Sequence, residues 1–394
     1  MNKQQEPGLR FKGFSGEWKE KYLDDIGEFS AGGDLKKEKL TLFGRYPVLA
    51  NALTNNGIVG FYDDYEFESP AITITGRGDV GIAKARKENF SAVVRLLVLK
   101  NKPNYDVDFL EQAINNIDFH IESTGVPQLT VPQCKSYSIY LPSEPEQTQL
   151  GNFFRRLDSQ IAESRAVLEK SCQLKKAMLA KMFPANGEKI PKIRFKGFEG
   201  EWREWKLGAF GKATSGTSLE SEFCEDGNYK VISIGSYSEK SAYTDQGIRT
   251  HKNDKTEKRI LNKNDLTMIL NDKTSSGRII GRVLLIDQND TYVYNQRTQR
   301  IEIDQEHFIP LFLYHLLNAE NMRQKIIYSA QGNTQIYVNW SGIKNLEYLI
   351  PPTKAEQTAI GNFFRQLDET IALQSAEVEK LNQLKKGLLA AMLV

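Results

Sequence analysis

Two sequence motifs occur twice in this chain, and their order limits the folds that it can adopt. LRFKGFSGEWKE at residues 9–20 returns as IRFKGFEGEWRE at 193–204, and EQTQLGNFFRRLD at 146–158 returns as EQTAIGNFFRQLD at 356–368. The first pair is offset by about 184 positions and the second by about 210, so the interior of the second copy is longer by roughly 26 residues. The two interiors scarcely match. The pattern predicts two copies of one structural frame that hold different contents.

Length and composition favour a globular protein with two domains. At 394 residues the chain is too long for one ordinary core, and 40% of its residues are hydrophobic while 26% are charged. The three cysteines, Cys134, Cys172 and Cys224, form no close pair, which argues against a disulfide framework and fits a reducing compartment. The sequence starts without a secretory signal pattern and contains no apolar run of about 18 residues. We therefore expect a cytoplasmic protein that does not span a membrane.

The charges gather locally although they cancel over the whole chain. The net charge is +2, from 52 basic and 50 acidic side chains. Bases outnumber acids between residues 77 and 102 and again between 249 and 282. Such clusters suit a polyanionic partner, and the alternative is a solvated charged surface.

Each copy is predicted to be a mixed α/β globule followed by one long helix, which gives the α/β (α+β) fold class. Strand-like runs at 68–76, 91–99, 136–142, 228–235, 278–287 and 300–304 predict mostly antiparallel sheet, and 107–117 and 309–326 resemble helices. The expected segments are a globular domain at 1–142, a long helix at 143–183, a linker at 184–192, a second globular domain at 193–352 and a second long helix at 353–394.

The two long helices are predicted from their start signals and their periodicity. Ser143 with Glu146, and Thr353 with Glu356, have the pattern of a capping box, in which the glutamate reaches back to the cap. Apolar residues then follow in alternating steps of four and three, as in a coiled coil. We expect the helices to pair antiparallel with one globule at each end, and the alternative is that each helix packs on its own globule or on a partner chain. The predicted seam residues are Phe154, Leu157, Ile161, Leu168, Phe364, Leu367, Ile371 and Val378.

The search for catalytic and cofactor motifs finds little. Residues 76–81 read G-x-G-x-x-G after a strand, but the next strand follows at once, where a dinucleotide-binding fingerprint needs a helix. A basic glycine turn that approaches a phosphate through Arg77 fits better. No nucleotide-binding P-loop occurs, and the four histidines show no metal-ligand spacing. We therefore expect neither a catalytic site nor a metal site.

Polar side chains of the kind that read DNA are dense in both interiors. Arginine and lysine suit guanine or phosphate, and asparagine and glutamine suit adenine. The candidate DNA-binding residues are Lys36, Lys37, Asn51, Asn55, Asn56, Arg77, Lys84, Arg86, Lys87 and Gln128 in the first copy, and Lys273, Ser275, Arg278, Arg282, Asn295, Gln296, Arg297, Gln299 and Gln335 in the second.

Gln128 and Gln335 stand out because each lies in a Gly-x-x-Gln-apolar-x-Val segment, at 125–131 and 332–338. This recurrence fits a DNA contact, and it fits equally a structural turn that enters the last strand.

The doubled RFKGF-x-GEW and EQT-x-x-GNFFR-x-LD motifs resemble the DNA specificity subunit of type I restriction-modification systems, over essentially the whole chain. The resemblance implies two target-recognition domains, each of which reads one half of a split, asymmetric sequence in double-stranded DNA, with the paired helices as a spacer. It also implies a non-catalytic subunit on which two methyltransferase subunits and the restriction subunits assemble. S-adenosylmethionine, ATP and Mg are then expected on those partners, with no cofactor on this chain and no membrane partner. The alternatives are a protein-only coiled-coil scaffold and an undetected nucleic-acid-modifying enzyme.

Overall fold

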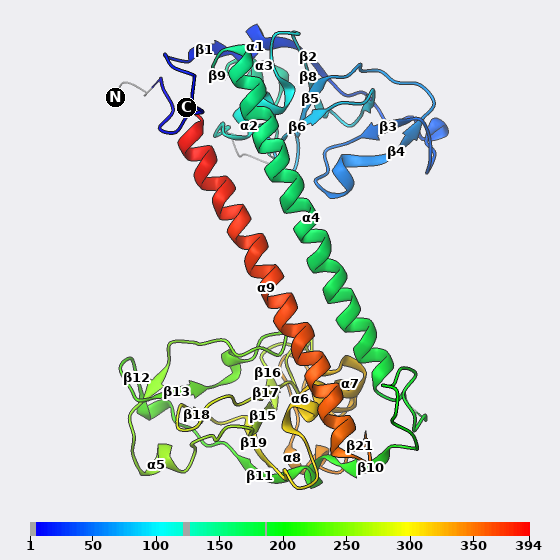
Figure 1. Cartoon of the computed structure of the whole chain (residues 1–394), viewed down its shortest axis with the longest axis vertical. Helices are drawn as coiled ribbons and strands as arrows, with labels where there is room; N and C mark the ends of the chain where they lie inside the picture. Colours follow the sequence, from blue (N-terminus) through cyan, green and yellow to red (C-terminus); the bar gives the residue numbers. More distant parts are fainter. Residues whose placement is uncertain (1–4, 121–126, 186) are drawn as a thin grey trace. The chain divides into compact units, whose positions relative to one another are not determined.

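The computed structural model describes residues 5–120, 127–185 and 187–394. Contacts divide the chain into two compact units, which we call unit 1 (Met1–Ala166 with Ser375–Val394) and unit 2 (Val167–Gln374). Figure 1 labels the elements of both. Each unit takes half of each long helix, a division that the repeated motifs did not reveal. Part of the predicted linker, residue 186, lies outside the described residues, as does Gly125.

Unit 1 contains a four-stranded antiparallel sheet in the order β2-β8-β5-β6, a three-stranded sheet β4-β3-β7 and a pair β1-β9. The elements are β1 Lys19–Tyr22, α1 Leu23–Ile26, β2 Gly27–Ala31, η1 Lys37–Lys39, β3 Tyr46–Leu49, η2 Thr54–Gly57, β4 Ile58–Tyr62, β5 Ala71–Ile74, β6 Ala83–Arg86, β7 Ser91–Ala92, β8 Leu97–Asn101, α2 Val107–Asn115, α3 Val131–Lys135, β9 Ser138–Leu141 and the start of α4 Glu144–Met182.

Unit 2 repeats this plan with sheets β11-β19-β15-β17 and β12-β14-β13-β18 and the pairs β10-β21 and β16-β20. Its elements are β10 Arg203–Lys206, η3 Leu207–Ala209, β11 Gly211–Ser215, η4 Glu220–Glu222, β12 Phe223–Cys224, β13 Tyr229–Ile232, η5 Ile234–Ser236, β14 Arg249–Thr250, α5 Asp254–Glu257, β15 Leu266–Ile269, β16 Asn271–Asp272, β17 Val283–Leu285, β18 Tyr292–Tyr294, β19 Thr298–Ile303, α6 Pro310–Asn318, α7 Glu320–Tyr328, β20 Ile336–Tyr337, α8 Trp340–Ile343, β21 Glu347–Ile350 and the start of α9 Lys354–Met392.

The strand pairing is mostly antiparallel, as predicted, and the described part of each unit has one parallel pair of strands. β3 runs parallel to β7 in unit 1, and β13 runs parallel to β18 in unit 2. In each unit the second strand of the parallel pair, β7 or β18, comes directly before a long strand of the antiparallel sheet, β8 or β19. The two interiors therefore share a topology that their sequences do not show.

Three predicted elements are interrupted. The strand predicted at 91–99 is two strands, β7 and β8, because Val94 and Arg95 take positive φ and turn the chain. The strand predicted at 278–287 begins only at Val283, after a turn in which Gly281 takes a left-handed φ of 75°. The helix predicted at 309–326 breaks at Ala319, whose ψ of 131° is extended.

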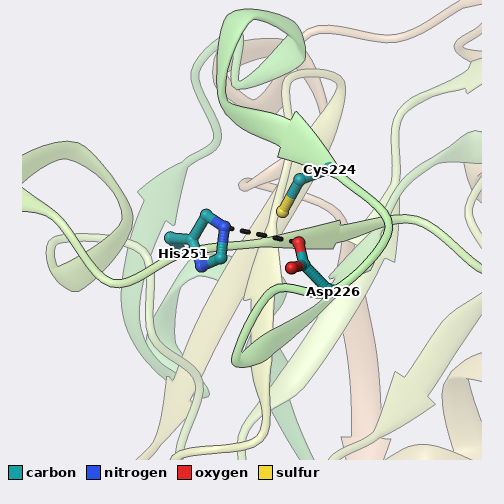
Figure 2. A group of neighbouring side chains, drawn as sticks. All are labelled: Cys224, Asp226 and His251. Carbon is teal, nitrogen blue, oxygen red and sulfur yellow. Dashed lines mark ion pairs between the residues drawn. The ribbon is translucent and has the colours of Figure 1, made fainter.

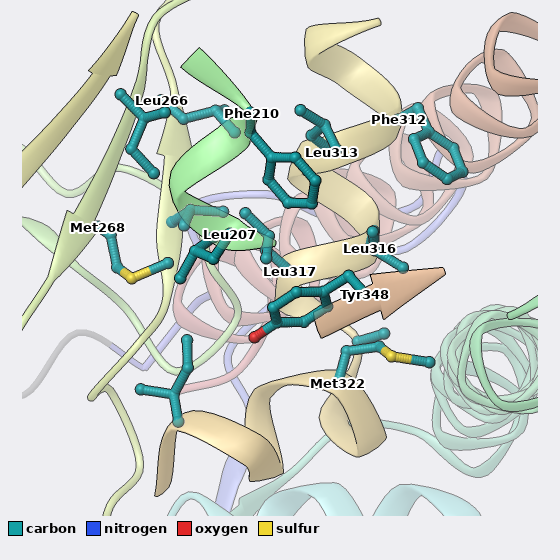
Figure 3. Close-up of a cluster of buried hydrophobic side chains, with 14 of the residues drawn as sticks. Leu207, Phe210, Leu266, Met268, Phe312, Leu313, Leu316, Leu317, Met322 and Tyr348 are labelled. Atoms are coloured by element: carbon teal, nitrogen blue, oxygen red, sulfur yellow. The ribbon is translucent and has the colours of Figure 1, made fainter. Parts of the chain in front are cut away.

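The main core of unit 2 forms where β15, α6, α7 and β21 meet (Figure 3). Phe210, Phe312 and Tyr348 are among its largest side chains, and all three are buried. Unit 1 has the matching cluster around Trp18, Phe109 and Phe154. Removal of this apolar surface from water is the main stabilising contribution in each unit.

Within each unit the halves of α4 and α9 run antiparallel. In unit 1, Asp158 on α4 pairs with Lys385 on α9 at 2.7 Å, and Arg165 donates to Asn382 at 2.8 Å. The residue numbers rise along α4 as they fall along α9, which defines the direction. In unit 2, Lys175 on α4 pairs with Asp368 on α9.

The two repeated motifs of each unit contact one another through an ion pair. The Arg10 guanidinium donates to both carboxylate oxygens of Glu146, at 2.6 and 2.7 Å, and Arg194 does the same with Glu356 at 2.7 and 2.8 Å. The capping-box pattern had suggested a different partner for these glutamates, the helix cap. Thr353 does accept a hydrogen bond from the Glu356 amide, at 3.3 Å.

Of the described residues, none belongs to a helix that is both long and apolar enough to cross a bilayer.

Candidate nucleic-acid interface

Four loops of unit 1 meet where β5 ends, and we call them the first loop cluster: residues 51–57, 76–81, 93–96 and 127–130. The Asn51 side chain joins two of them, because its oxygen accepts from the Gly76 amide at 2.7 Å and its nitrogen donates to the Val94 carbonyl at 2.6 Å. The Leu129 amide donates to the Gly76 carbonyl at 2.9 Å, which places Gln128 opposite Arg77. The loops are therefore held by hydrogen bonds to the end of a buried strand.

The first loop cluster brings together five of the predicted contact residues: Asn51, Asn55, Asn56, Arg77 and Gln128. Asn55 and Asn56 are exposed and take positive φ, which asparagine tolerates better than most residues. Arg77 has no ion-pair or side-chain hydrogen-bond partner among the described residues. Asn51 already spends both polar atoms on the backbone, so its role in the structure is to position the loops.

The glycine turn at 76–81 joins the antiparallel strands β5 and β6, with Gly78 and Gly81 at positive φ. The next regular element is the strand β6 and not a helix, so this turn lacks the helix N-terminus that a dinucleotide-binding fingerprint needs. The basic turn remains available to a phosphate.

The other predicted cations of unit 1 differ in how free they are. Arg86 donates to Thr73 at 2.9 Å and to the Asn56 carbonyl at 3.0 Å, and burial lowers its pKa to about 10. Lys87 pairs with Asp108 at 2.6 Å, and the hydrogen bond from Lys36 to Glu66 at 3.1 Å raises the pKa of that lysine. Lys37 and Lys84 are exposed.

In unit 2 the equivalent loops meet at the end of β15, and we call them the second loop cluster: residues 271–279, 295–298 and 331–337. The Leu270 amide donates to the Arg297 carbonyl at 2.8 Å, and the Val338 amide donates to the Leu270 carbonyl at 2.9 Å. Four predicted contact residues, Lys273, Ser275, Arg297 and Gln335, are exposed here.

Asp272 holds the turn that carries Lys273 and Ser275. Its carboxylate accepts from the Thr274 and Ile279 amides, each at 3.0 Å. Burial acts to raise its pKa, but these hydrogen bonds outweigh burial and leave the pKa lowered, so the carboxylate is a stable anchor for the loop. Its role is therefore to anchor this loop.

Several other predicted contacts of unit 2 are occupied within the fold. Gln299 is 1% exposed and Asn295 is 6% exposed. Arg278 pairs with Glu239 at 3.1 Å, and Arg282 donates to Ser241 at 2.9 Å while burial lowers its pKa. Such side chains would have to break these contacts to reach DNA. The prediction of base contacts at these positions stays untested.

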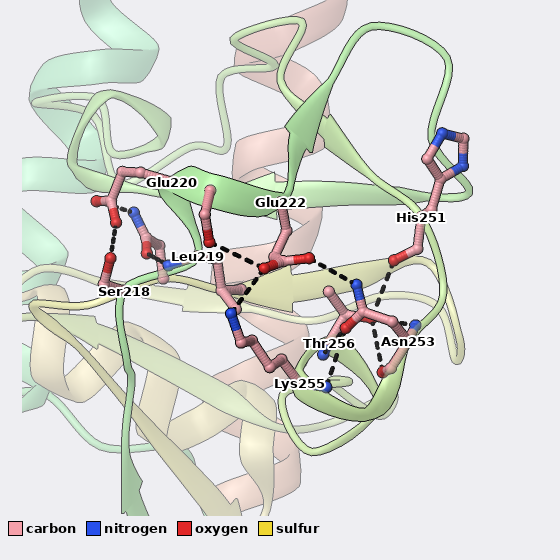
Figure 4. A network of polar contacts seen from close by, with 10 residues as sticks. Ser218, Leu219, Glu220, Glu222, His251, Asn253, Lys255 and Thr256 are labelled. Carbon is pink, nitrogen blue, oxygen red and sulfur yellow. Dashed lines mark hydrogen bonds and ion pairs between the residues drawn. The ribbon is translucent and has the colours of Figure 1, made fainter.

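The Glu220 carboxylate binds two of the predicted contact residues, Asn295 and Gln296. It accepts from Asn295 at 2.9 Å and from Gln296 at 2.8 Å, and it also bonds Ser218. The hydrogen bonds, from Ser218 first, lower the pKa of Glu220 to about 2. Figure 4 shows Ser218 beside Glu220, and it shows the separate contacts of Glu222 with Lys255 and Asn253.

The Gly-x-x-Gln repeat does not place its two glutamines at equivalent positions. Gln128 lies opposite Arg77, whereas in unit 2 the residue opposite Asn271 is Tyr337, two positions beyond Gln335. A short helix follows in each unit, α3 or α8, before the last strand. The repeated segment therefore leads into a short helix in both units, and not directly into the last strand as the turn alternative had it.

A group that sequence spacing did not reveal lies at the edge of unit 2. Cys224 on β12, Asp226 and His251 bring one ligand atom each within 4.8 Å of one another (Figure 2). The His251 ring nitrogen and the Asp226 carboxylate are 3.5 Å apart. Thiolate, carboxylate and imidazole are all ligand types that zinc accepts, but a tetrahedral site needs four ligands. Their proximity depends on the β12–β14 pairing, which the sequence search missed.

The chain matches a family described as Type I restriction modification DNA specificity domain, at residues 15–170 and 199–383, one match in each repeat. The Methanocaldococcus jannaschii type I restriction enzyme MjaVIII specificity subunit is 23% identical over 370 residues, which is 89% of this chain and 86% of that protein. A Mycoplasma pneumoniae protein named as a type I specificity subunit, S.MpnORF507P, is 29% identical over 146 residues. That match spans 37% of this chain and only 40% of the relative.

Two solved structures share the fold. The type-I restriction-modification system S subunit from M. genitalium aligns over 99% of both chains with a TM-score of 0.70 at 16% identity. A chain from a solved type I R-M system covers 94% of this chain and 96% of its own, with a TM-score of 0.53 at 15% identity. The predicted α/β fold class, with two similar domains and long helices, is confirmed.

Proposed function

We propose, because the chain belongs to the type I restriction-modification DNA specificity family, that it reads a two-part DNA sequence and holds the methyltransferase and restriction subunits of its complex. The resemblance drawn from the repeated motifs is thereby confirmed at the level of the family. The observation that carries the proposal is the repetition of one topology around two unrelated sets of loop residues.

The two loop clusters support two separate readers. Each lies at the end of a buried strand, β5 or β15. Each presents a cation whose side chain has no partner among the described residues, such as the partly exposed Arg77 and the exposed Lys273. Their residue types differ, so the half-sites that they recognise would differ as well. A good bidentate contact to a base discriminates by about 1–3 kcal/mol, enough for one or two side chains to decide a base pair.

The long helices support the role of an assembly scaffold. In unit 1 a groove between α4 and α9 is lined by Phe153, Leu157, Leu384 and Leu388 among others. Leu384 remains 50% exposed, and Leu174 is 48% exposed at the matching place of the LKK segment on α4 in unit 2. Two equivalent apolar positions suit two copies of one partner, the methyltransferase subunit. Catalysis, with S-adenosylmethionine, ATP and Mg, then belongs to the partners.

The reading function is tested by mapping methylated bases in DNA from cells that express the chain with its methyltransferase subunit. We expect one asymmetric motif made of two specified parts and an unspecified gap. A continuous motif, or methylation by this chain without its partner, would contradict the proposal.

The scaffold function is tested by Leu174→Asp and Leu384→Asp, with Ala372→Asp on an exposed position of α9 as the control. Because both leucines are half exposed, the fold should persist, as circular dichroism can check. Native mass spectrometry should show one bound methyltransferase subunit for each single variant and none for the double variant. Retention of two subunits by the double variant would exclude this surface.

A further inference from the structure

Arg95 and Arg297 occupy the same position in the two units. In unit 1 the Val93 amide donates to the Leu49 carbonyl at 2.8 Å, and in unit 2 the Asn295 amide donates to the Ile232 carbonyl at 2.9 Å. Each arginine comes two residues after that bond. Arg95 lies two residues before β8, and Arg297 lies directly before β19. The equivalence follows from the hydrogen-bond ladder, since the neighbouring sequences, VVRLL and NQRTQ, align poorly.

A second pair of bonds confirms the equivalence. The Gly32 amide donates to the Leu96 carbonyl, and the Gly216 amide donates to the Thr298 carbonyl, both at 2.8 Å. Leu96 and Thr298 are the residues directly after the two arginines. The two turns are therefore held from both sides by matching backbone contacts.

Both arginines have an unusual backbone conformation and an exposed side chain. Their φ angles are 59° and 67°, in the left-handed region that glycine or asparagine occupies more readily. Both are exposed, and neither guanidinium has an ion pair or hydrogen bond among the described residues. Within the described part of the fold, no hydrogen bond or ion pair accounts for an arginine side chain at either turn.

The surroundings of each turn are those of the loop clusters. In unit 1, Asn51 ties the turn to Gly76 through the Val94 carbonyl, next to Arg77. In unit 2 the Arg297 carbonyl itself accepts from Leu270, the residue before Asn271. Each arginine thus lies beside the side chains proposed to read bases, on a turn that a buried strand holds still.

We propose that Arg95 and Arg297 are matching phosphate contacts, one for each half of the DNA site, and this inference depends on the proposed function. Residues common to both readers cannot distinguish two different half-sites. They can serve what both half-sites share, the sugar-phosphate backbone. Such contacts fix the position of a protein on the duplex and carry no sequence information themselves. The adjacent residues that differ, such as Gln128 and Lys273, are left to specify bases.

The test replaces each arginine with glycine in the complex of the chain with its methyltransferase subunit. Glycine removes the side chain and also suits the positive φ, so the melting temperature should stay the same or rise. Arg95→Lys keeps the charge and should restore part of the affinity. Arg203→Ala is the matched control, because Arg203 is an exposed arginine on β10 without a side-chain partner among the described residues.

Affinity for a duplex that carries the mapped motif is measured by fluorescence anisotropy at several salt concentrations. Each glycine variant should weaken binding by about tenfold and lower the slope of log affinity against log salt by about 1, with additive effects in the double variant. The methylated motif should be unchanged. Unaltered affinity and slope in the double variant, or a changed motif, would overturn the inference and leave the proposed function standing. Failure of the wild-type complex to prefer its motif would overturn both.

Discussion

Arg10 and Glu146 are 136 residues apart in sequence, yet their side chains share two hydrogen bonds. The Glu146 side chain is 1% exposed, so its carboxylate depends on this arginine for solvation. Gln147 next to it accepts from the Asp106 amide at 3.2 Å and donates to the Pro142 carbonyl at 3.0 Å. A side chain at Gly151 would come within 2.8 Å of the Phe109 amide nitrogen, at the start of α2. Glu146, Gln147 and Gly151 of the repeated motif therefore each make a different structural contact.

Arg10→Ala should destabilise the protein by at least about 2 kcal/mol, because it leaves a buried carboxylate without its partner. Arg194→Ala should have a similar effect through Glu356. Chemical denaturation measures the loss, with the exposed Arg203→Ala as the control. Equal stability of Arg10→Ala and the control would show that the ion pair contributes nothing to folding.

His315 gives unit 2 a predictable dependence on pH. Burial lowers the pKa of its imidazole to about 3, with a smaller contribution from the charge of Lys175. Asp368 lies 4.0 Å away but already pairs with Lys175, so it offsets little. Because the folded pKa lies below the unfolded value of about 6.5, the stability that the neutral ring contributes is complete above pH 6.5 and is lost as the pH falls toward 3.

The variant His315→Gln should remove this dependence. Glutamine is chosen because Gln112 on α2 of unit 1 occupies the position that His315 has on α6 of unit 2. Gln112 donates to Asp158 at 3.2 Å, and the new glutamine could donate to Asp368 in the same way. Between about pH 5.5 and 4 the wild-type unfolding free energy should decrease by up to about 1.4 kcal/mol per pH unit more than that of the variant. Urea unfolding at several pH values checks this, and parallel curves for the two proteins would contradict the assigned protonation state.

Individual contact residues were the hardest part to predict from sequence. Residue type favoured Gln299 and Asn295 as base contacts, but strand alternation and a bond to Glu220 put both side chains inside. Arg95 was not among the predicted contacts, because its equivalence to Arg297 depends on a backbone ladder that no local pattern reveals.

The long helices were the elements that sequence predicted best. Their start signals and heptad spacing are local, and the observed bounds Glu144–Met182 and Lys354–Met392 lie within one residue or two of the expected ends. The strand at 91–99 failed because a left-handed turn at Val94 and Arg95 divides a continuous apolar run. Periodicity cannot show such a turn when neither residue is glycine or asparagine.

Leu157→Asp tests the pairing of the helices in unit 1. Leu157 is 6% exposed, so a carboxylate there would be buried without a partner and should cost more than about 3 kcal/mol. Ala162→Asp, on an exposed position of the same helix, is the control. Denaturant unfolding compares the two variants. Equal midpoints would show that Leu157 does not contribute to the packing of the helices. The assignment of the remaining seam residues to partner docking stays a prediction.

At the scale of the whole molecule, the duplication is visible in the repeated motifs because specific side-chain contacts hold those segments together. The interiors between the motifs are held mainly by backbone pairing, so they show no sequence similarity. Ion pairs such as Arg10–Glu146 and close contacts such as that of Gly151 constrain residue identity. Strands β3 and β13 need only apolar residues facing the core, so their sequences can drift apart while their pairing persists. This freedom is what allows one topology to present two different sets of loop side chains.

The central claim is that the two interiors read DNA independently. The most direct measurement replaces residues 21–142 with the corresponding interior of another specificity subunit and keeps both repeated motifs. The methylated bases produced with the same methyltransferase subunit are then mapped. We predict a new sequence in one half of the motif, with the other half retained. A change in both halves of the motif would contradict the account.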